Sequence, residues 1–202
     1  MRELEDTMNK MAYEKAPGLD GFTMNFFHAC WDILKYEVLA IVEDSRKIGN
    51  ILKAFNSTFL TLILKESGAD ELRKFISIAL CNVIYKIITN VIENHLQPLL
   101  PWLISLEQAS FVEGRQIMDG ILLVQETIHS LKGSKFSSMF PMLDLSKAYD
   151  KMNCKFLEEI LKALSFQQQW VDWIMKLISS SFFSILVNET LIHPFVSSRG
   201  IR

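Results

Sequence analysis

The sequence predicts an α+β fold in which helices outnumber strands. Apolar residues recur at three- and four-residue steps over several long segments, which is the spacing of helices with one buried face. Four short apolar segments rich in β-branched and aromatic residues are typical of strands. These strands do not alternate regularly with the helices, as they would in a parallel α/β protein.

The composition fits one folded domain and excludes several classes of protein. Of the 202 residues, 50% are hydrophobic and 22% are charged, which is too apolar for a disordered chain. The 21 basic and 23 acidic residues give a net charge of −2, so any nucleic-acid contact has to come from a local basic patch. No apolar run approaches about 18 residues, so no membrane-spanning helix is predicted. The acidic start and three scattered cysteines favour a reduced, intracellular chain, and leave nucleus and cytoplasm open.

The first half of the chain is predicted to hold two helices with a strand between them. After a turn rich in Pro and Gly, apolar residues at helical spacing run from 27 to 42. Thr23 is a candidate cap for this helix, and Gly49 is a candidate end. Residues 58–64 form a short β-prone segment, which predicts a strand. A second helical stripe covers residues 80–95.

The second half continues with a third helical stripe at residues 117–131, which Gly133 ends. Residues 140–145 are predicted to form a short buried strand. Two further helices and the two strands of a hairpin follow, at 156–164, 170–178, 182–187 and 191–196.

One acidic side chain stands out, because Asp144 lies at the end of the predicted strand 140–145. Burying a carboxylate without a partner is costly, so an acid at this place calls for an explanation. Magnesium takes hard oxygen ligands and bridges substrate phosphates, so a metal ion at the strand end is one explanation. An aspartate that caps a turn is the other. The sequence has no zinc-protease, serine-hydrolase, Walker A or dinucleotide-binding motif.

Six blocks in a fixed order resemble the reverse transcriptase domain of non-LTR (LINE-type) retrotransposons, especially those abundant in plant genomes. The blocks are Lys15–Gly21, Phe55–Lys65, Leu80–Ile87, Glu107–Ile117, Leu143–Asp150 and Ser197–Arg202. Any single block is a weak signal, and the resemblance is carried by the order and spacing of all six. It covers about residues 8–202.

The resemblance implies an N-terminal fragment of the right-hand polymerase fold, mostly helical, with a small antiparallel sheet. About residues 8–135 would form the fingers and their connection to the palm, and about residues 136–202 the start of the palm. The rest of the palm and the thumb would be absent. The implied reaction is RNA-directed DNA synthesis, in which dNTPs are added to a primer 3′-hydroxyl. The implied partners are an RNA template, a DNA primer and dNTPs, and the implied cofactor is Mg²⁺.

The resemblance also implies roles for five residues. Asp144 matches the catalytic aspartate that holds Mg²⁺, and Leu145 follows it where the family's backbone reaches the metals or the triphosphate. Tyr149 matches the aromatic residue that lies under the incoming sugar and excludes a 2′-hydroxyl. Lys65 matches a nucleotide-binding position, and Arg115 matches a basic position that contacts template or primer. The structural alternatives are a core tyrosine and solvated basic side chains.

The sequence departs from the family pattern at two points. Ile76 stands where the family usually has the arginine that grips the triphosphate, and Ser77 stands where it has proline. The family's Asp-Asp pair does not occur in the 202 residues, and the single carboxylate of Asp144 does not clamp two ions. We therefore expect a poorly soluble remnant that is inactive by itself. The alternatives are one part of an active polymerase, a non-catalytic nucleic-acid-binding or protein-interaction module, and an unrelated helical interaction domain.

Overall fold

The computed structural model describes all residues of the chain except 69, 134–138, 146, 188–189, 198 and 202. It forms two compact units, of which the first holds residues 1–91 and 147–202, and the second holds residues 92–146. Helices and one mixed sheet make up the described residues, so the predicted α+β class is confirmed. The boundaries of these two units differ from those predicted for the fingers and the palm. The division of the chain into fingers and palm therefore stays a prediction.

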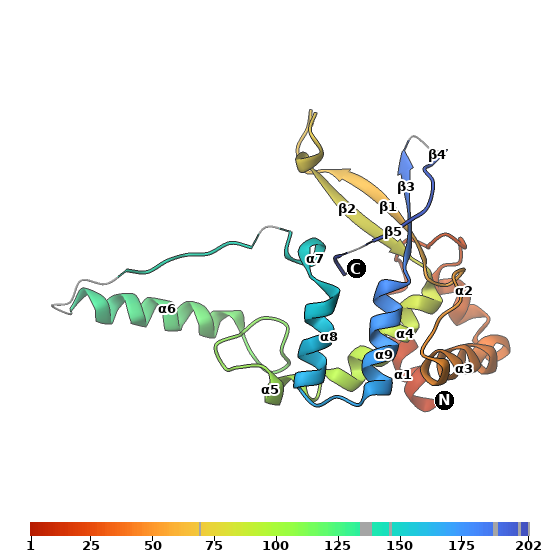
Figure 1. Ribbon diagram of the computed structural model, residues 1–202, viewed down its shortest axis with the longest axis horizontal. Helices are drawn as coiled ribbons and strands as arrows, with labels where there is room; N and C mark the ends of the chain where they lie inside the picture. The colour runs from red at the N-terminus through yellow and green to blue at the C-terminus, as the bar shows by residue number, and fades with distance from the viewer. Residues whose placement is uncertain (69, 134–138, 146, 188–189, 198, 202) are drawn as a thin grey trace. The chain divides into compact units, whose positions relative to one another are not determined.

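The sheet lies in the first unit and is built around β1 (Ser57–Leu64). As Figure 1 shows, β1 lies between β2 (Phe75–Cys81), which is antiparallel to it, and β3 (Phe182–Val187), which is parallel to it. The short strands β4 (Thr190–Leu191) and β5 (Phe195–Val196) pair antiparallel with β3. The sheet is therefore mixed rather than wholly antiparallel, because a long crossover separates β1 from β3 and long crossovers permit parallel pairing.

Helices form at most of the places where the sequence predicts them. In the first unit they are α1 (Arg2–Lys10), α2 (Met24–Ala29), α3 (Trp31–Ile48), the 3-10 helix η1 (Leu72–Lys74), α7 (Ala148–Lys151), α8 (Cys154–Ala163) and α9 (Gln168–Ser179). The helix α4 (Val83–Leu96) begins in the first unit and ends in the second, which also holds α5 (Leu100–Leu103) and α6 (Ile117–Lys132). In the described residues, no helix has both the length and the hydropathy to cross a membrane.

Local signals decide where several helices begin and end. The hydroxyl of Thr23 accepts a hydrogen bond from the amide of Phe26 and caps α2, as predicted. Gly49 ends α3 in the left-handed conformation with φ of 63°, which glycine adopts without a steric cost. The single helix that was predicted here is broken at Cys30 into α2 and α3.

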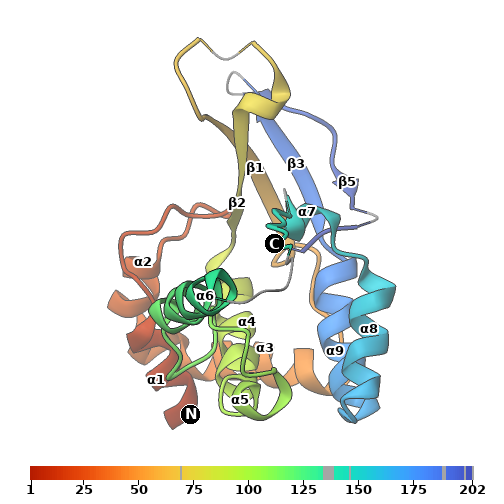
Figure 2. The same cartoon turned by 90° about the vertical axis from the view of Figure 1, so that its left-hand side faces the viewer.

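The core of the first unit lies where α3, α4 and α9 meet under the sheet. Ile87 and Ile88 of α4 are completely buried. The indole of Trp173 on α9 donates to the Ser45 hydroxyl of α3 over 3.2 Å, and that hydroxyl donates to the carbonyl of Val42 over 2.8 Å. Figure 2 shows α9 beside α8, which covers it from one side. The buried polar groups of Trp173 and Ser45 are therefore satisfied within the core.

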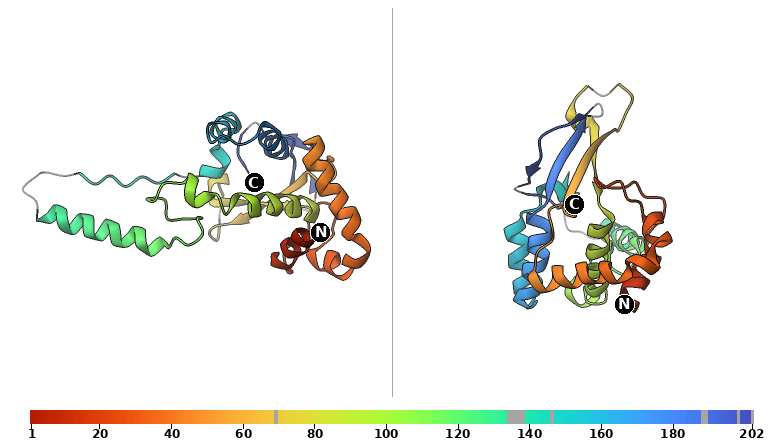
Figure 3. Two further views of the ribbon diagram at one scale, coloured as in Figure 1. Left: turned by 90° about the horizontal axis from the view of Figure 1, so that it is seen from below. Right: turned by 90° about the vertical axis from the view of Figure 1, so that its right-hand side faces the viewer.

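Three strand predictions need correction. Residues 140–145 form no strand, and Figure 3 draws them as coil. Both sides of β1 are already paired, and among the described residues no strand pairs with this segment. Residues 75–81 form β2, although the sequence indicated no strand here and placed Leu80 in a helix. Residues 191–196 pair with β3 as predicted, but the pairing is interrupted between β4 and β5, where Pro194 has no amide hydrogen to donate.

Candidate nucleotide pocket

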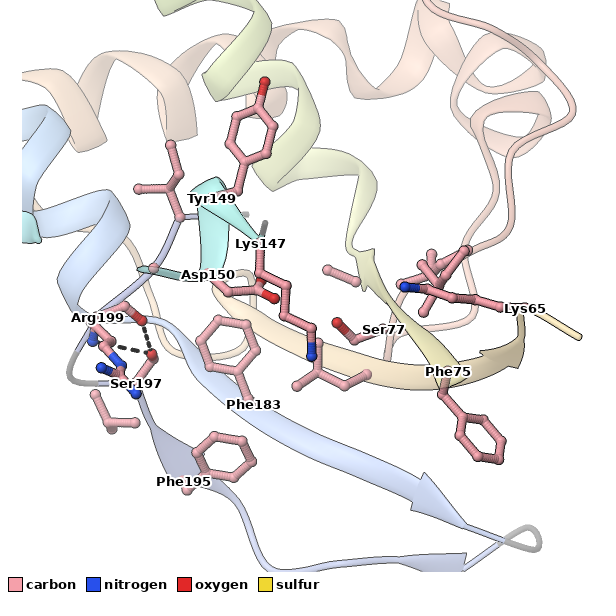
Figure 4. Close-up of a pocket in the computed structure, with 17 residues that line it drawn as sticks. Lys65, Phe75, Ser77, Lys147, Tyr149, Asp150, Phe183, Phe195, Ser197 and Arg199 are labelled. Atoms are coloured by element: carbon pink, nitrogen blue, oxygen red, sulfur yellow. Dashed lines mark hydrogen bonds between the residues drawn. The ribbon is translucent and has the colours of Figure 1, made fainter. Parts of the chain in front are cut away.

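A cavity of about 960 Å³ opens beside the sheet of the first unit, and its volume suits a small-molecule ligand. One wall consists of side chains from β1, β2, β3 and β5. The other wall consists of Lys147, Tyr149 and Asp150, at the start of α7, and of the described residues between 197 and 201. Figure 4 shows these two walls facing each other.

Backbone hydrogen bonds hold the second wall together. The amide of Gly200 donates to the carbonyl of Met152 over 2.8 Å, and the amide of Ile201 donates to the carbonyl of Tyr149 over 3.0 Å. Gly200 has φ of 89°, and a Cβ atom on it would lie 2.9 Å from the carbonyl oxygen of Asp150. The position therefore needs glycine for both its backbone angle and its close approach. Two blocks that are about 50 residues apart in the sequence are joined in this wall.

The charge of the pocket is positive in a chain whose net charge is negative. Among the described residues that line it, Lys65, Lys147 and Arg199 are basic and Asp150 is acidic. Within the part of the chain that the structure describes, none of these three basic residues takes part in an ion pair. A charged hydrogen bond contributes about 1.5–3 kcal/mol, so three basic side chains without ion-pair partners favour an anionic ligand.

The sheet side of the pocket is apolar. The rings of Phe183 and Phe195 stack with their centroids 5.9 Å apart, on neighbouring strands. Ile76 and Ile78 of β2 also line the pocket, with 48% and 39% of their surfaces exposed. The arrangement suits a ligand with an apolar part against the sheet and a negative part near the basic side chains.

The pocket brings two of the predicted site residues together. Lys65 follows β1 and Tyr149 lies in α7, and both line the cavity. Tyr149 is 61% exposed, so it is not a core tyrosine, and its ring points away from the ammonium group of Lys147 in Figure 4. The roles predicted for Lys65 and Tyr149 stay predictions.

Asp144 and Leu145 lie in the second unit, in an extended segment with exposed side chains. The predicted Mg²⁺ site needs several oxygen ligands around one ion. In the described part of the chain, no group of three or more acidic, histidine or cysteine side chains is placed to hold a metal ion. The donor set present around Asp144 therefore does not fit a complete magnesium site.

Arg115 also belongs to the second unit, where its guanidinium group donates to four backbone carbonyls. The acceptors are Pro101, Ile104, Ser105 and Gln108. In the same segment the pKa of the Glu107 carboxyl lies below its usual value, because it accepts hydrogen bonds from its own amide and from the Ser105 hydroxyl, with the charge of Arg115 nearby. These contacts show Arg115 holding the fold of residues 101–116, and the predicted contact with template or primer stays a prediction.

Sequence reasoning did not identify Lys147 or Arg199 as pocket residues. Both lie inside blocks that resemble polymerase motifs, at Leu143–Asp150 and Ser197–Arg202. The signal that could have identified them is a basic residue inside a block that resembles a polymerase motif. Phe183 and Phe195 were not identified as pocket residues either, although the hairpin that pairs their strands was predicted.

Two comparisons with known proteins bear on the family of this chain. A family model for reverse transcriptase (RNA-dependent DNA polymerase) matches residues 63–202. Over 200 residues, or 99% of the chain, the sequence is 28% identical to the transposon TX1 uncharacterized 149 kDa protein of Xenopus laevis. The chain spans 15% of the length of that relative. Because the family model covers more than half of its residues, the chain belongs to the reverse transcriptase (RNA-dependent DNA polymerase) family.

Proposed function

We propose that the chain forms part of the catalytic domain of an RNA-directed DNA polymerase encoded by a non-LTR (LINE-type) retrotransposon, and that its pocket receives the incoming nucleotide. The family match and the transposon relative support this reading. The observation that carries it is the convergence of Lys65, Tyr149 and Arg199 on one cavity, from three blocks that are far apart in the sequence. Origin from a plant-type element stays a prediction.

Proteins of this family take an RNA template, a primer and dNTPs, and a divalent metal serves their chemistry. In this chain we assign the triphosphate to the basic side of the pocket, with Lys65 as one contact. The sugar is assigned to Tyr149, whose ring would exclude a 2′-hydroxyl. The backbone role that the resemblance implies for Leu145, next to the metals or the triphosphate, is proposed for the complete polymerase. The apolar side of the pocket, at Phe183 on the sheet, offers a surface for the remaining, less polar part of the nucleotide.

Nucleotide binding by this pocket should be weaker than the family pattern implies. Ile76 lines the cavity on β2, at the position where the resemblance places an arginine. Isoleucine has no hydrogen-bond donor and no charge. The loss of one charged contact of about 1.5–3 kcal/mol corresponds to about one to two orders of magnitude in affinity.

The metal-binding role of Asp144 is proposed for the complete polymerase rather than for this chain alone. One exposed carboxylate does not hold the pair of ions that clamps the attacking and leaving oxygens in two-metal transfer. We expect the 202-residue chain to bind dNTPs without extending a primer on an RNA template. For Arg115, four hydrogen bonds to backbone carbonyls favour a role in folding, and contact with template is the second assignment.

The test is equilibrium binding of a dNTP and of the matching deoxynucleoside to the 202-residue chain. We expect dNTP binding that weakens about tenfold in Lys65→Gln, because a phosphate contact is lost, with no change for the nucleoside. Lys74→Gln is the matched control, because Lys74 is paired with Glu66 and Asp70 and does not line the pocket. Absence of dNTP binding at millimolar concentration, or equal losses in both variants, would contradict the proposal.

A further inference from the structure

Lys147 differs from the other basic residues of the pocket in its backbone. Its φ of 55° and ψ of 44° place it in the left-handed region, which residues with a Cβ atom rarely adopt. Such an outlier persists only where the surrounding structure holds it, and it justifies a hypothesis of function at that residue. In Figure 4 the Lys147 side chain extends from the start of α7 toward the sheet, into the space between the two walls.

The strand β2 contributes no basic residue to the pocket, and this makes the position of Lys147 important. The described β2 residues that line the pocket are Phe75, Ile76, Ser77, Ile78 and Ala79. None of them is charged. Lys74 directly precedes Phe75 in the sequence but does not line the pocket, and Lys65, which follows β1, is the described basic residue that lines the sheet side. A basic group that reaches the cavity from α7 compensates for that lack from the opposite wall.

Asp150 also affects the balance of charge in the pocket. It lies one turn after Lys147 in α7 and also lines the cavity, but no ion pair joins the two side chains in the described structure. The ammonium group of Lys147 is thus exposed to the cavity without a fixed carboxylate partner. It is available to an anionic group of a ligand.

We propose that Lys147 contacts the phosphates of the nucleotide and replaces the charged contact that Ile76 does not provide. This inference rests on the proposed function of the pocket and names a further binding residue within it. The ammonium group of Lys147 would reach the phosphates from the α7 wall rather than from β2. Lys147 would then determine affinity for the polyphosphate part of the ligand and leave affinity for the nucleoside unchanged.

The experiment measures binding of inorganic tripolyphosphate, a dNTP and a deoxynucleoside to the 202-residue chain and its variants. Lys147→Gln should weaken tripolyphosphate and dNTP binding about tenfold and leave nucleoside binding unchanged. Lys147→Arg keeps the charge and should retain most of the affinity. Lys151→Gln is the matched control, because Lys151 is an exposed lysine of the same helix that does not line the pocket. Circular dichroism melting curves check that the variants remain folded.

A second variant tests the replacement of Ile76 directly. If Lys147 supplies the missing contact, Ile76→Arg should restore dNTP affinity to Lys147→Gln by about the factor that was lost. Unchanged binding in Lys147→Gln, together with a loss in Lys65→Gln, would overturn this inference and leave the proposed function standing. Equal losses in Lys147→Gln and Lys151→Gln would also overturn it, since they indicate a general charge effect. Absence of dNTP binding by the parent chain would overturn both.

Discussion

Gly200 lies directly against the backbone of Asp150, so close that a Cβ atom on Gly200 would stand 2.9 Å from the Asp150 carbonyl oxygen. The contact joins the last turn of α7 to residues near the end of the chain and forms one wall of the pocket. A hydrogen bond from the Gly200 amide to the carbonyl of Met152 reinforces it. The wall therefore depends on one residue that lacks a side chain.

Gly200→Ala is expected to loosen this wall. The variant forces a side chain into a backbone with φ of 89° and into contact with Asp150, a combination that costs about 1–3 kcal/mol. In this variant the backbone amide at position 200 should exchange its hydrogen faster, and dNTP affinity should fall. Gly21→Ala is the control, because Gly21 has a similar φ of 75° with no atom within 4 Å of the added Cβ. Equal effects in the two variants would show that only the backbone angle matters.

Gly18→Ala is expected to destabilise the first unit as a whole. A Cβ atom on Gly18 would clash with the backbone of Asn82. Asn82 is almost completely buried, and its side-chain amide donates to the carbonyl of Ala54 over 2.7 Å. Overpacking of this kind costs about 1–3 kcal/mol, measurable by urea denaturation.

The matched control for Gly18→Ala is Gly120→Ala in the interior of α6. There the added Cβ would make only an ordinary contact of 3.8 Å with Ala109. Alanine also favours the helix by about 1 kcal/mol over glycine, so this variant should be neutral or stabilising. A Gly18→Ala protein as stable as the parent would show that the approach of Gly18 to Asn82 is not tight in solution.

Tyr149→Val is expected to reduce discrimination between dNTPs and ribonucleotides, because the ring proposed to exclude the 2′-hydroxyl is removed. The measurement is the ratio of the two dissociation constants. Because the Tyr149 side chain is exposed, stability should change by less than about 0.5 kcal/mol. Tyr36→Val, at another exposed tyrosine, serves as the control. An unchanged ratio in Tyr149→Val would remove this role from Tyr149.

Arg115→Lys is expected to open residues 101–116 without unfolding the first unit. The ammonium group of lysine does not reproduce the planar fork of the guanidinium group, so several of the four carbonyls lose their donor. Limited proteolysis should cut this segment faster. Arg46→Lys, which alters an exposed ion pair with Glu43, should leave the cleavage rate unchanged. Faster cleavage in Arg46→Lys as well would contradict the assignment.

Local signals made most helices predictable. The stripes that predicted α6, α8 and α9 are set by contacts three and four residues apart, and Thr23 and Gly49 act on the turn next to them. The strands were less predictable, because a strand needs a partner elsewhere in the chain. Residues 75–81 find that partner in β1, whereas residues 140–145 do not find one.

The same distinction applies to the pocket. Lys65 and Tyr149 could be named from sequence because they lie in blocks that resemble polymerase motifs, although nothing in the sequence placed them in one cavity. Lys147 and Arg199 were missed, since their place in the pocket follows from the backbone of α7 and the packing of Gly200 on Asp150. The hairpin that brings Phe183 and Phe195 together was predicted, but that their rings line the cavity follows from the packing of the sheet.

The sequence by itself determined the family, the α+β class, most helices and the blocks in which the candidate site residues lie. These properties follow from residue identity and from short-range periodicity, which do not depend on distant parts of the chain. The tertiary structure alone decided that β1 pairs parallel with β3, that three basic side chains meet at one cavity, and that Arg115 binds backbone carbonyls. The reason is that each of these contacts joins residues whose neighbours along the chain carry no information about the partner.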